Sequence, residues 1–183
     1  MINTIATDTG LIAKYRQHLP VPDDACVVSL SEGNTSLIKL HSLSEADRGV
    51  SIYAKVEGEN PTGSFKDRGM TVAITMALAA GNDAVICAST GNTSAAAAAY
   101  AARAGMRAFV VIPDGKIALG KLAQAMMHGA NVIQIAGNFD DGMEIVKRMP
   151  EEAPVALVNS VNPYLFFVKQ KTAYEIVDLV GDA

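Results

Sequence analysis

The sequence predicts an α/β fold in which a parallel β-sheet is flanked by helices. Short apolar runs recur along the chain, and each run is continuous rather than alternating, which is typical of strands covered on both faces. Helical patterns separate these runs, and three of the four end at a glycine. Two neighbouring parallel strands need a crossover connection, which is usually a helix and is right-handed. The alternation of strands and helices therefore favours a parallel sheet over an antiparallel one.

The first part of the chain is expected to hold little regular structure. We predict a helix around 11–18, then a proline-punctuated loop and a short strand near 37–40. The polar stretch 41–48 that follows is a candidate boundary. The run SIYAKV at 51–56 predicts another strand before the regular part of the chain begins.

The remaining elements follow in regular alternation. The predicted strands lie at 84–87, 108–112, 131–135 and 155–158. The predicted helices lie at 66–80, 93–104, 117–128 and 140–149, with Pro150 ending the last of them. After a turn at 159–163, a further helix is predicted at 172–180.

Composition narrows the classes of function. The 183 residues suit one domain, or one domain and a piece of another, and half of them are hydrophobic. The mean hydropathy of +0.22 has two readings: apolar surface that expects a partner or a missing segment, or the alanine content alone. The formal charge of −4, without a basic stripe, argues against nucleic-acid binding.

No segment predicts export, a membrane span or a metal site. The N-terminus lacks the basic and apolar regions of a signal peptide, and the alanine-rich run is far shorter than the roughly 20 residues of a membrane span. Cys26 and Cys87 form no CxxC pair, and His18, His41 and His128 are scattered. We therefore expect a cytoplasmic protein with reduced thiols and no bound metal.

The decapeptide NPTGSFKDRG at 60–69 carries the first candidate catalytic residue. Lys66 is predicted at the start of a helix, where the positive end of the helix dipole disfavours an ammonium group and so lowers the pKa of the amine. A neutral amine can form an imine with an aldehyde cofactor. The simpler reading is a solvated lysine that pairs with Asp67.

The segment STGNTSAAAAAYAARAG at 89–105 is the second candidate. A Gly/Asn turn there precedes an alanine-rich helix, and the backbone N–H groups at the helix start can bind an anion. The Ser, Thr and Asn residues are equally well explained as helix caps. The alanines are expected to let this helix pack close to the sheet.

Together the two segments resemble the pyridoxal-phosphate (PLP) enzymes of the tryptophan synthase β fold, called fold type II, and in detail the threonine synthases. The resemblance covers nearly the whole chain and is strongest over 32–163. It implies that Lys66 holds the cofactor, that Asn92 hydrogen-bonds the cofactor's phenolic oxygen and that Phe139 lies near its pyridine ring. The substrate contacts that it implies are Ser89, Thr90, Gly91 and Thr93 for the carboxylate, and Asn159 and Ser160 for the phosphate.

Two segments depart from the motifs that they resemble, each by having a leucine at a position that should bind a ligand. Threonine synthases follow the Asn-Ser pair with an arginine, but this chain has Leu165, and leucine cannot clamp a phosphate in a bidentate way. The segment GKIALGK at 115–121 matches the start of a P-loop, but Leu122 stands where Ser or Thr should bind magnesium, so nucleotide binding is not expected. The resemblance implies instead that Lys116 faces the anionic site.

The activity that the resemblance implies is the PLP-dependent conversion of O-phospho-L-homoserine and water to L-threonine and phosphate. This is the last step of threonine biosynthesis, and the enzyme is a carbon–oxygen lyase acting on phosphates, expected to be a homodimer at full length. The alternatives are a threonine dehydratase-like PLP enzyme and a non-catalytic fragment or interaction module.

Family members continue with a Gly/Asn-rich loop for the cofactor phosphate and a Ser/Thr facing the pyridine nitrogen, and neither is found before Ala183. We therefore interpret the chain as an N-terminal part, with the fold incomplete at the C-terminus. On this interpretation 1–48 belong to the larger domain, 49–158 form a small βα domain with the cofactor lysine, and 159–183 begin the rest of the larger domain. We expect this 183-residue chain to bind PLP weakly or not at all and to form no threonine.

Overall fold

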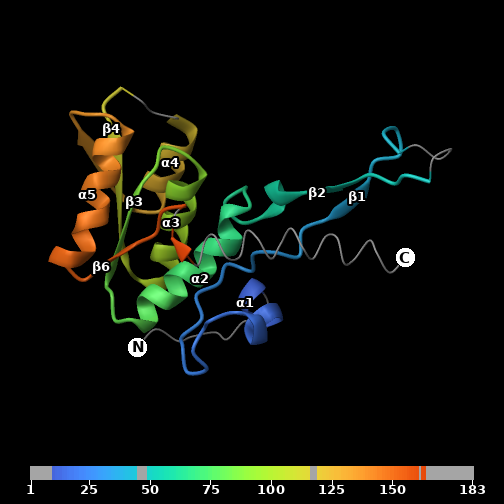
Figure 1. Cartoon of the computed structure of the whole chain (residues 1–183), viewed down its shortest axis with the longest axis horizontal. Helices are drawn as coiled ribbons and strands as arrows, with labels where there is room; N and C mark the ends of the chain where they lie inside the picture. The colour runs from blue at the N-terminus through green and yellow to red at the C-terminus, as the bar shows by residue number, and fades with distance from the viewer. Residues whose placement is uncertain (1–9, 45–48, 116–118, 161, 164–183) are drawn as a thin grey trace.

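The computed structural model describes residues 10–44, 49–115, 119–160 and 162–163 (Figure 1). Its helices are α1 (Leu11–Tyr15), α2 (Lys66–Ala79), α3 (Asn92–Ala104), α4 (Leu119–Met127) and α5 (Phe139–Glu152), with 3-10 turns η1 (Arg16–His18) and η3 (Glu57–Glu59). Its strands are β1 (Leu37–Lys39), β2 (Tyr53–Lys55), β3 (Ala84–Ala88), β4 (Arg107–Pro113), β5 (Asn131–Ile135) and β6 (Val155–Leu157). The predicted helix at 172–180, together with Lys116 and Leu165, lies outside the described residues.

Four strands form one parallel sheet in the order β5-β4-β3-β6. Val85 of β3 lies opposite Ala108 of β4 on one side and Ala156 of β6 on the other, and Val110 of β4 lies opposite Val132 of β5. The predicted fold class, a parallel sheet flanked by helices, is confirmed. The chain runs outward from β3 to β5 and then returns to the far side of β3, so the strand order reverses between β3 and β6. Ligands of open α/β sheets bind outside the carboxyl ends of the strands at such a reversal.

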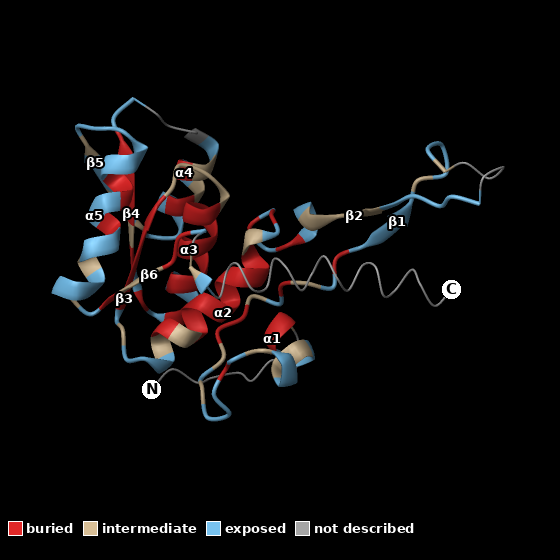
Figure 2. Cartoon of the chain, in the orientation of Figure 1, coloured by how far each residue is buried: buried red, intermediate tan, exposed pale blue. Residues whose placement is uncertain are grey.

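Helices α2, α3 and α4 lie on one side of the sheet and α5 on the other (Figure 1, Figure 2). Strand β3 is buried along its whole length, as expected of a strand covered on both faces. The same expectation is wrong for β5, where Ile133 is 43% exposed. The reason is that β5 is an edge strand, and α5 packs chiefly over β3, β4 and β6.

Helix α3 lies at the centre of the main hydrophobic core. Its residues Ala95–Ala99 are buried, and the helix packs against α2, α4, β3 and β4. Small side chains permit this close approach on several sides at once, which confirms the role expected of the alanines. The helix ends at Gly105, whose φ of 70° places it in the left-handed region that favours glycine.

The N-terminal segment lies along α2 and α3, fixed there by a buried carboxylate. Glu32 is only 1% exposed and accepts hydrogen bonds from Leu11 N (3.0 Å), Ser29 Oγ (3.1 Å) and Tyr100 Oη (2.9 Å). A Cβ atom at Gly10 would lie 2.3 Å from Ser29 Oγ, and Gly10 has a φ of 107°, so this position requires glycine. The segment is therefore part of the packed body of the protein.

Strands β1 and β2 form an antiparallel hairpin that projects from this body (Figure 1). Leu37 lies opposite Lys55, and the hairpin exposes Leu37, Ile38 and Tyr53. The hydrogen bonds between β1 and β2 join the segment before residue 48 to the segment after residue 49, across the predicted domain boundary. The assignment of those sides to different domains stays a prediction.

Element ends differ from the prediction by more than two residues in two places. The helix predicted at 11–18 is divided into α1 and η1, and α5 continues through Pro150 to Glu152. The expectation that Pro150 ends that helix is wrong, because a proline near the end of a helix removes one backbone donor while the last turn still closes, with Ala153 N donating to Met149 O at 3.0 Å. Within the described parts of the chain, no helix is long and apolar enough to cross a bilayer.

Candidate functional site

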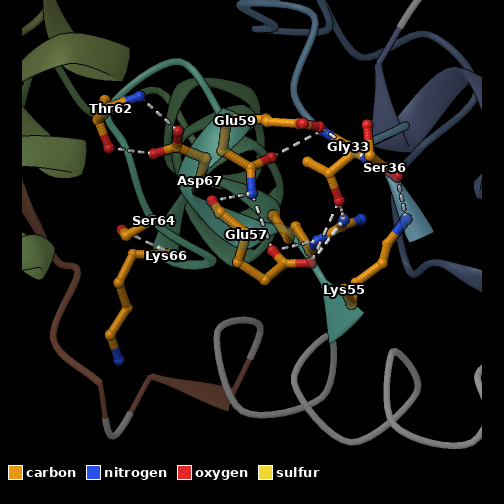
Figure 3. Close-up of polar contacts among 12 residues, drawn as sticks. Gly33, Ser36, Lys55, Glu57, Glu59, Thr62, Ser64, Lys66 and Asp67 are labelled. Atoms are coloured by element: carbon orange, nitrogen blue, oxygen red, sulfur yellow. Dashed lines mark hydrogen bonds and ion pairs between the residues drawn. The ribbon is translucent and has the colours of Figure 1, made fainter. Parts of the chain in front are cut away.

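Lys66 is the first residue of α2 and follows residues 60–65, which we call the lysine loop. Its backbone N–H donates to Ser64 Oγ at 3.3 Å, and its side chain points away from the network that holds the loop (Figure 3). The amine of Lys66 donates to Ser160 Oγ at 2.9 Å. That hydroxyl lies 3.2 Å from Thr93 Oγ1, so side chains from α2, α3 and the turn after β6 meet at one place.

The residue after Lys66 fixes the lysine loop from the inside. Asp67 is buried, and its carboxylate accepts hydrogen bonds from the Thr62 backbone N–H at 2.7 Å and from the Thr62 hydroxyl (Figure 3). Burial raises the pKa of Asp67 above its usual value, although the bonds from Thr62 act in the opposite direction. Asp67 therefore supports the lysine loop from the inside, and the simpler reading, a solvated Lys66 that pairs with Asp67, stays a prediction.

The next residue, Arg68, ties the loop to more distant parts of the chain. Its guanidinium forms a two-pronged ion pair with Glu57, at 2.8 Å from Nε and 2.9 Å from Nη2, and donates to Thr35 Oγ1 at 3.0 Å. Burial by itself raises the pKa of Glu57, but Arg68 and Asn60 together hold that pKa below its usual value. Sequence reasoning missed Arg68 as a functional residue, and the only available signal was its place in the decapeptide.

Asn60, the first residue of the lysine loop, completes this attachment. Its Oδ1 accepts a hydrogen bond from Gly33 N at 2.9 Å, and its Nδ2 donates to Glu57 Oε2 at 2.8 Å. Nearby, Ser36 N donates to Glu59 Oε2 at 2.7 Å (Figure 3). The loop is thus fixed at its start by contacts with residues 33–36 and at its end by the first turn of α2.

Residues 89–91, which we call the serine loop, join β3 to α3. Gly91 N donates to Ser89 Oγ at 3.2 Å, and Ser94 Oγ donates back to Gly91 O at 2.7 Å. Gly91 occupies the N-cap position of α3 and gives it no side-chain cap. The reading of the Ser, Thr and Asn side chains as caps is therefore wrong for this position, and the helix start keeps the properties of an anion site.

Asn159 is buried, and its side-chain amide pairs with the backbone of β3. Its Oδ1 accepts from Ala88 N at 2.7 Å and its Nδ2 donates to Ala88 O at 3.1 Å, which continues the β3–β6 ladder with a side chain. Nδ2 also lies 2.8 Å from Met143 Sδ. The predicted contact of Asn159 with a substrate phosphate stays a prediction, because this geometry directs the amide at the sheet and fixes the position of Ser160 next to it.

The structure brings most of the predicted site residues to the edge of the sheet where the strand order reverses. Those that follow β3 or begin α3 are Ser89, Thr90, Gly91, Asn92 and Thr93, and those that follow β6 are Asn159 and Ser160. Phe139 lies apart from them: it is 51% exposed and begins α5, on the opposite side of the sheet from α2 and α3 (Figure 1). Its predicted place near a cofactor ring stays a prediction.

This arrangement suits the capture of a carbonyl compound that carries an anionic group. The amine of Lys66 supplies the nucleophile, and the hydroxyls of Thr93 and Ser160 with the start of α3 supply hydrogen-bond donors for an anion. Among residues 10–44, 49–115, 119–160 and 162–163, no group of three or more His, Cys, Asp or Glu residues is placed to hold a metal ion. An aldehyde at the lysine, with an anionic group of a substrate beside it, fits this set of groups.

Comparison with known proteins agrees with this chemistry. Residues 28–183 match the model of a family described as pyridoxal-phosphate dependent enzymes. The threonine synthase of Synechocystis is 59% identical over 175 residues, which cover 95% of this chain and 46% of that protein. The threonine synthase of Mycobacterium bovis is 60% identical over 175 residues, covering 95% and 48%. A crystal structure of O-ureido-L-serine synthase superimposes with a TM-score of 0.71 and 25% identity, covering 83% of this chain and 50% of that one. The chain thus spans about half the length of the curated relatives it matches.

Proposed function

Because the chain belongs to the family of pyridoxal-phosphate dependent enzymes, we propose that it forms the part of a threonine synthase that carries the cofactor lysine. The predicted resemblance to fold type II enzymes and to threonine synthases is confirmed by the matched family and relatives. Pyridoxal phosphate, the cofactor expected from the sequence, is the cofactor of this family.

The observation that carries the proposal is the contact between Lys66 and Ser160. A lysine that attacks an aldehyde must lose its proton first. A hydroxyl acceptor 2.9 Å from the amine fixes its position, and it can accept a hydrogen bond from either the charged or the neutral amine.

Bound pyridoxal phosphate supplies an electron sink for the carbon acids of the substrate. Lys66 would hold the cofactor and, once released from it, would take one proton each from Cα and Cβ of O-phospho-L-homoserine as phosphate leaves from Cγ. A proton would then be returned to Cγ, which becomes the methyl group. Water would add its hydroxyl at Cβ, its remaining proton balancing the released hydrogen phosphate, and a proton returned to Cα would complete L-threonine. The Asn92 amide binds the phenolic oxygen of the cofactor, while the serine loop and Thr93 hold the substrate carboxylate.

Ser160 is the residue through which the substrate phosphate would be recognised. Its hydroxyl lies between Lys66 and Thr93, and the amide of Asn159 fixes the backbone next to it through Ala88. We therefore assign Ser160 a direct contact with the phosphate and Asn159 a supporting role. A threonine dehydratase-like enzyme has no need of a phosphate contact, and the 59–60% identity to threonine synthases favours the synthase over that alternative.

The test uses a chimera in which the C-terminal part of the Synechocystis threonine synthase follows residue 160, since this chain spans about half of such a protein. In this chimera we expect Lys66→Ala to abolish both the absorbance of the lysine-bound cofactor and the formation of threonine. Lys147→Ala, an exposed lysine on α5, is the control that should keep both.

The outcomes separate the candidate functions. Phosphate release from O-phospho-L-homoserine supports the synthase, and ammonia release from threonine without phosphate release would support the dehydratase. Retention of the lysine-bound cofactor in Lys66→Ala would show that another lysine carries it. A chimera that binds the cofactor but turns over neither substrate would favour the non-catalytic alternative.

We also propose that the full-length enzyme is a cytoplasmic homodimer acting on this small-molecule substrate. Within it, 1–48 and 159–183 belong to the larger domain and 49–158 form the smaller one. Light scattering on the chimera tests the dimer, and a crystal structure of the chimera tests the division into domains.

A further inference from the structure

We propose that Lys121 and Gln124 of α4 are positioning residues for the lysine loop and thereby for Lys66; the importance of this placement rests on the proposed role of Lys66. Both side chains donate to the same atom, the backbone oxygen of Thr62, from Lys121 Nζ at 3.2 Å and from Gln124 Nε2 at 3.3 Å. Gln124 Oε1 also accepts from Lys121 Nζ at 3.3 Å, so the two donors hold each other in place.

Thr62 is held from two sides. Its N–H and its hydroxyl donate to Asp67 of α2, and its carbonyl accepts from the two side chains of α4. Thr62 is only 3% exposed, so these contacts are made away from water. One residue of the loop is thus fixed relative to two helices, a single helical turn in sequence before Lys66.

Helix α4 is a firm base for such a contact. Leu122 and Ala125 are buried in the main core, where α4 packs against α3. Lys121 and Gln124 are three residues apart and so lie on one face of the helix, next to the face that carries the buried pair. The polar face of α4 therefore reaches the lysine loop while its apolar face is held by the core.

The charge of Lys121 suits this place. Among the groups that act on the buried Asp67 carboxylate, Lys121 favours its ionised form and Glu32 opposes it. A Cβ atom at Gly63 would lie 3.9 Å from Lys121 Nζ, an ordinary van der Waals contact, so the ammonium lies next to the backbone of the lysine loop. A cation on one side of Thr62 and a carboxylate on the other thus bracket the loop.

This assignment gives a role to the segment GKIALGK, of which Lys121 is the last residue. Its resemblance to a P-loop has no nucleotide to explain it, since Leu122 replaces the magnesium-binding residue and is buried in the core. The second lysine of the segment donates to a backbone oxygen of the protein instead.

Hydrogen exchange and lysine labelling in the 183-residue chain test the proposal. Lys121→Met and Gln124→Leu should each speed exchange of the peptide covering 60–66 by about fivefold, the effect of one lost hydrogen bond, and should raise the labelling rate of the Lys66 amine by a similar factor. Lys121→Arg keeps a donor and should restore both readouts. Lys147→Met, the same change on the exposed face of α5, should alter neither.

The opposite results would overturn the proposal. Unchanged exchange over 60–66 in both α4 variants would show that the contacts with Thr62 do not hold the loop. An equal acceleration in α3 would show a general loss of stability instead of a local positioning role. Borohydride trapping of pyridoxal phosphate on Lys66 in the chimera with the Synechocystis C-terminal part is a separate measurement: its failure would count against the proposed function and leave the exchange result to decide the role of α4.

Discussion

The lysine loop and the serine loop both lead into a helix near the same edge of the sheet, but they are held in different ways. The lysine loop is attached to α2, to α4 and to residues 33–36 by side chains that come from distant parts of the sequence. The hydrogen bonds of the serine loop are local, from Gly91 N to Ser89 and from Ser94 to Gly91 O.

This difference follows from what each loop must do under the proposed function. A residue that forms a covalent link has to be placed before the reaction begins, because a small error in position is costly in rate. A loop that binds an anion with its backbone must leave its N–H groups available to the ligand. The lysine loop is therefore expected to be stiff without a ligand, and the serine loop is expected to become ordered when it binds one.

The largest effect is expected from Arg68→Met. This change removes both prongs of the ion pair with Glu57 and the hydrogen bond to Thr35, and it should lower the free energy of unfolding by about 2–3 kcal/mol, because it leaves a half-buried carboxylate without its charged partner. Urea unfolding followed by circular dichroism measures the loss. The matched control is Arg107→Met, whose pair with Asp83 is exposed and should contribute less than about 1 kcal/mol. Equal losses in the two variants would remove the evidence that the lysine loop is specially held.

A pair of glycine variants sharpens the comparison between the loops. Gly63 of the lysine loop has a φ of 77°, so Gly63→Ala should cost about 1–2 kcal/mol of unfolding free energy. At Gly91 a Cβ atom would meet nothing within 4 Å, so Gly91→Ala should change stability by less than about 0.5 kcal/mol. In the chimera the order should reverse for ligand binding, with Gly91→Ala weakening substrate binding more than Gly63→Ala. A substrate affinity unaffected by Gly91→Ala would argue that no ligand approaches the serine loop.

The smallest effect is a difference in pH dependence between two carboxylates of the lysine loop's support. The pKa of Asp67 is raised in the folded state. The free energy of unfolding therefore declines as the pH rises from the usual pKa of an aspartate towards this raised value, because the folded state resists the ionisation. Asp67→Asn should remove that decline. The folded-state pKa of Glu57 is lowered, so its contribution is present above its usual pKa and is lost as the pH falls through the lowered value. Urea titrations between about pH 3 and pH 7 give the free energy of unfolding of the unaltered chain and of each variant, Asp67→Asn and Glu57→Gln. The difference between the unaltered chain and the variant should fall with rising pH for Asp67→Asn and should rise with pH for Glu57→Gln. Slopes of the same sign would contradict the two environments described above.

The order of strands and helices could be predicted from the sequence because each strand is a continuous apolar run and most helices end at a glycine. The elements that cover each strand could not be predicted from the sequence. The run at 131–135 is expected to be buried like the run at 84–87, although it contains Asn131 and Gln134, but it forms an exposed edge because burial depends on where α5 lies over the sheet. A local pattern contains no information about such a distant neighbour.

The site shows the same division. The segments around Lys66 and Asn92 could be singled out because each has a distinctive local sequence. The partners of Arg68 could not, since Thr35 is 33 residues away and comes from a different part of the fold. Asn159 shows a further limit. Its residue type fits a phosphate ligand, but in the fold its amide pairs with the backbone of Ala88, which lies 71 residues earlier in the sequence. Only the structure shows this pairing, by which the amide continues the sheet. Polar side chains can serve a ligand or the backbone, and their sequence does not decide between the two.

The buried carboxylate of Glu32 has a consequence for the order in which the protein is assembled. Synthesis starts at the N-terminus, so Glu32 leaves the ribosome well before Tyr100, which lies 68 residues later. A contact of that span forms only after the intervening chain has been ordered, because closing a long loop is entropically unfavourable. The N-terminal segment is therefore made before α3 but can complete its docking only after α3 has formed, when the Tyr100 hydroxyl reaches the Glu32 carboxylate.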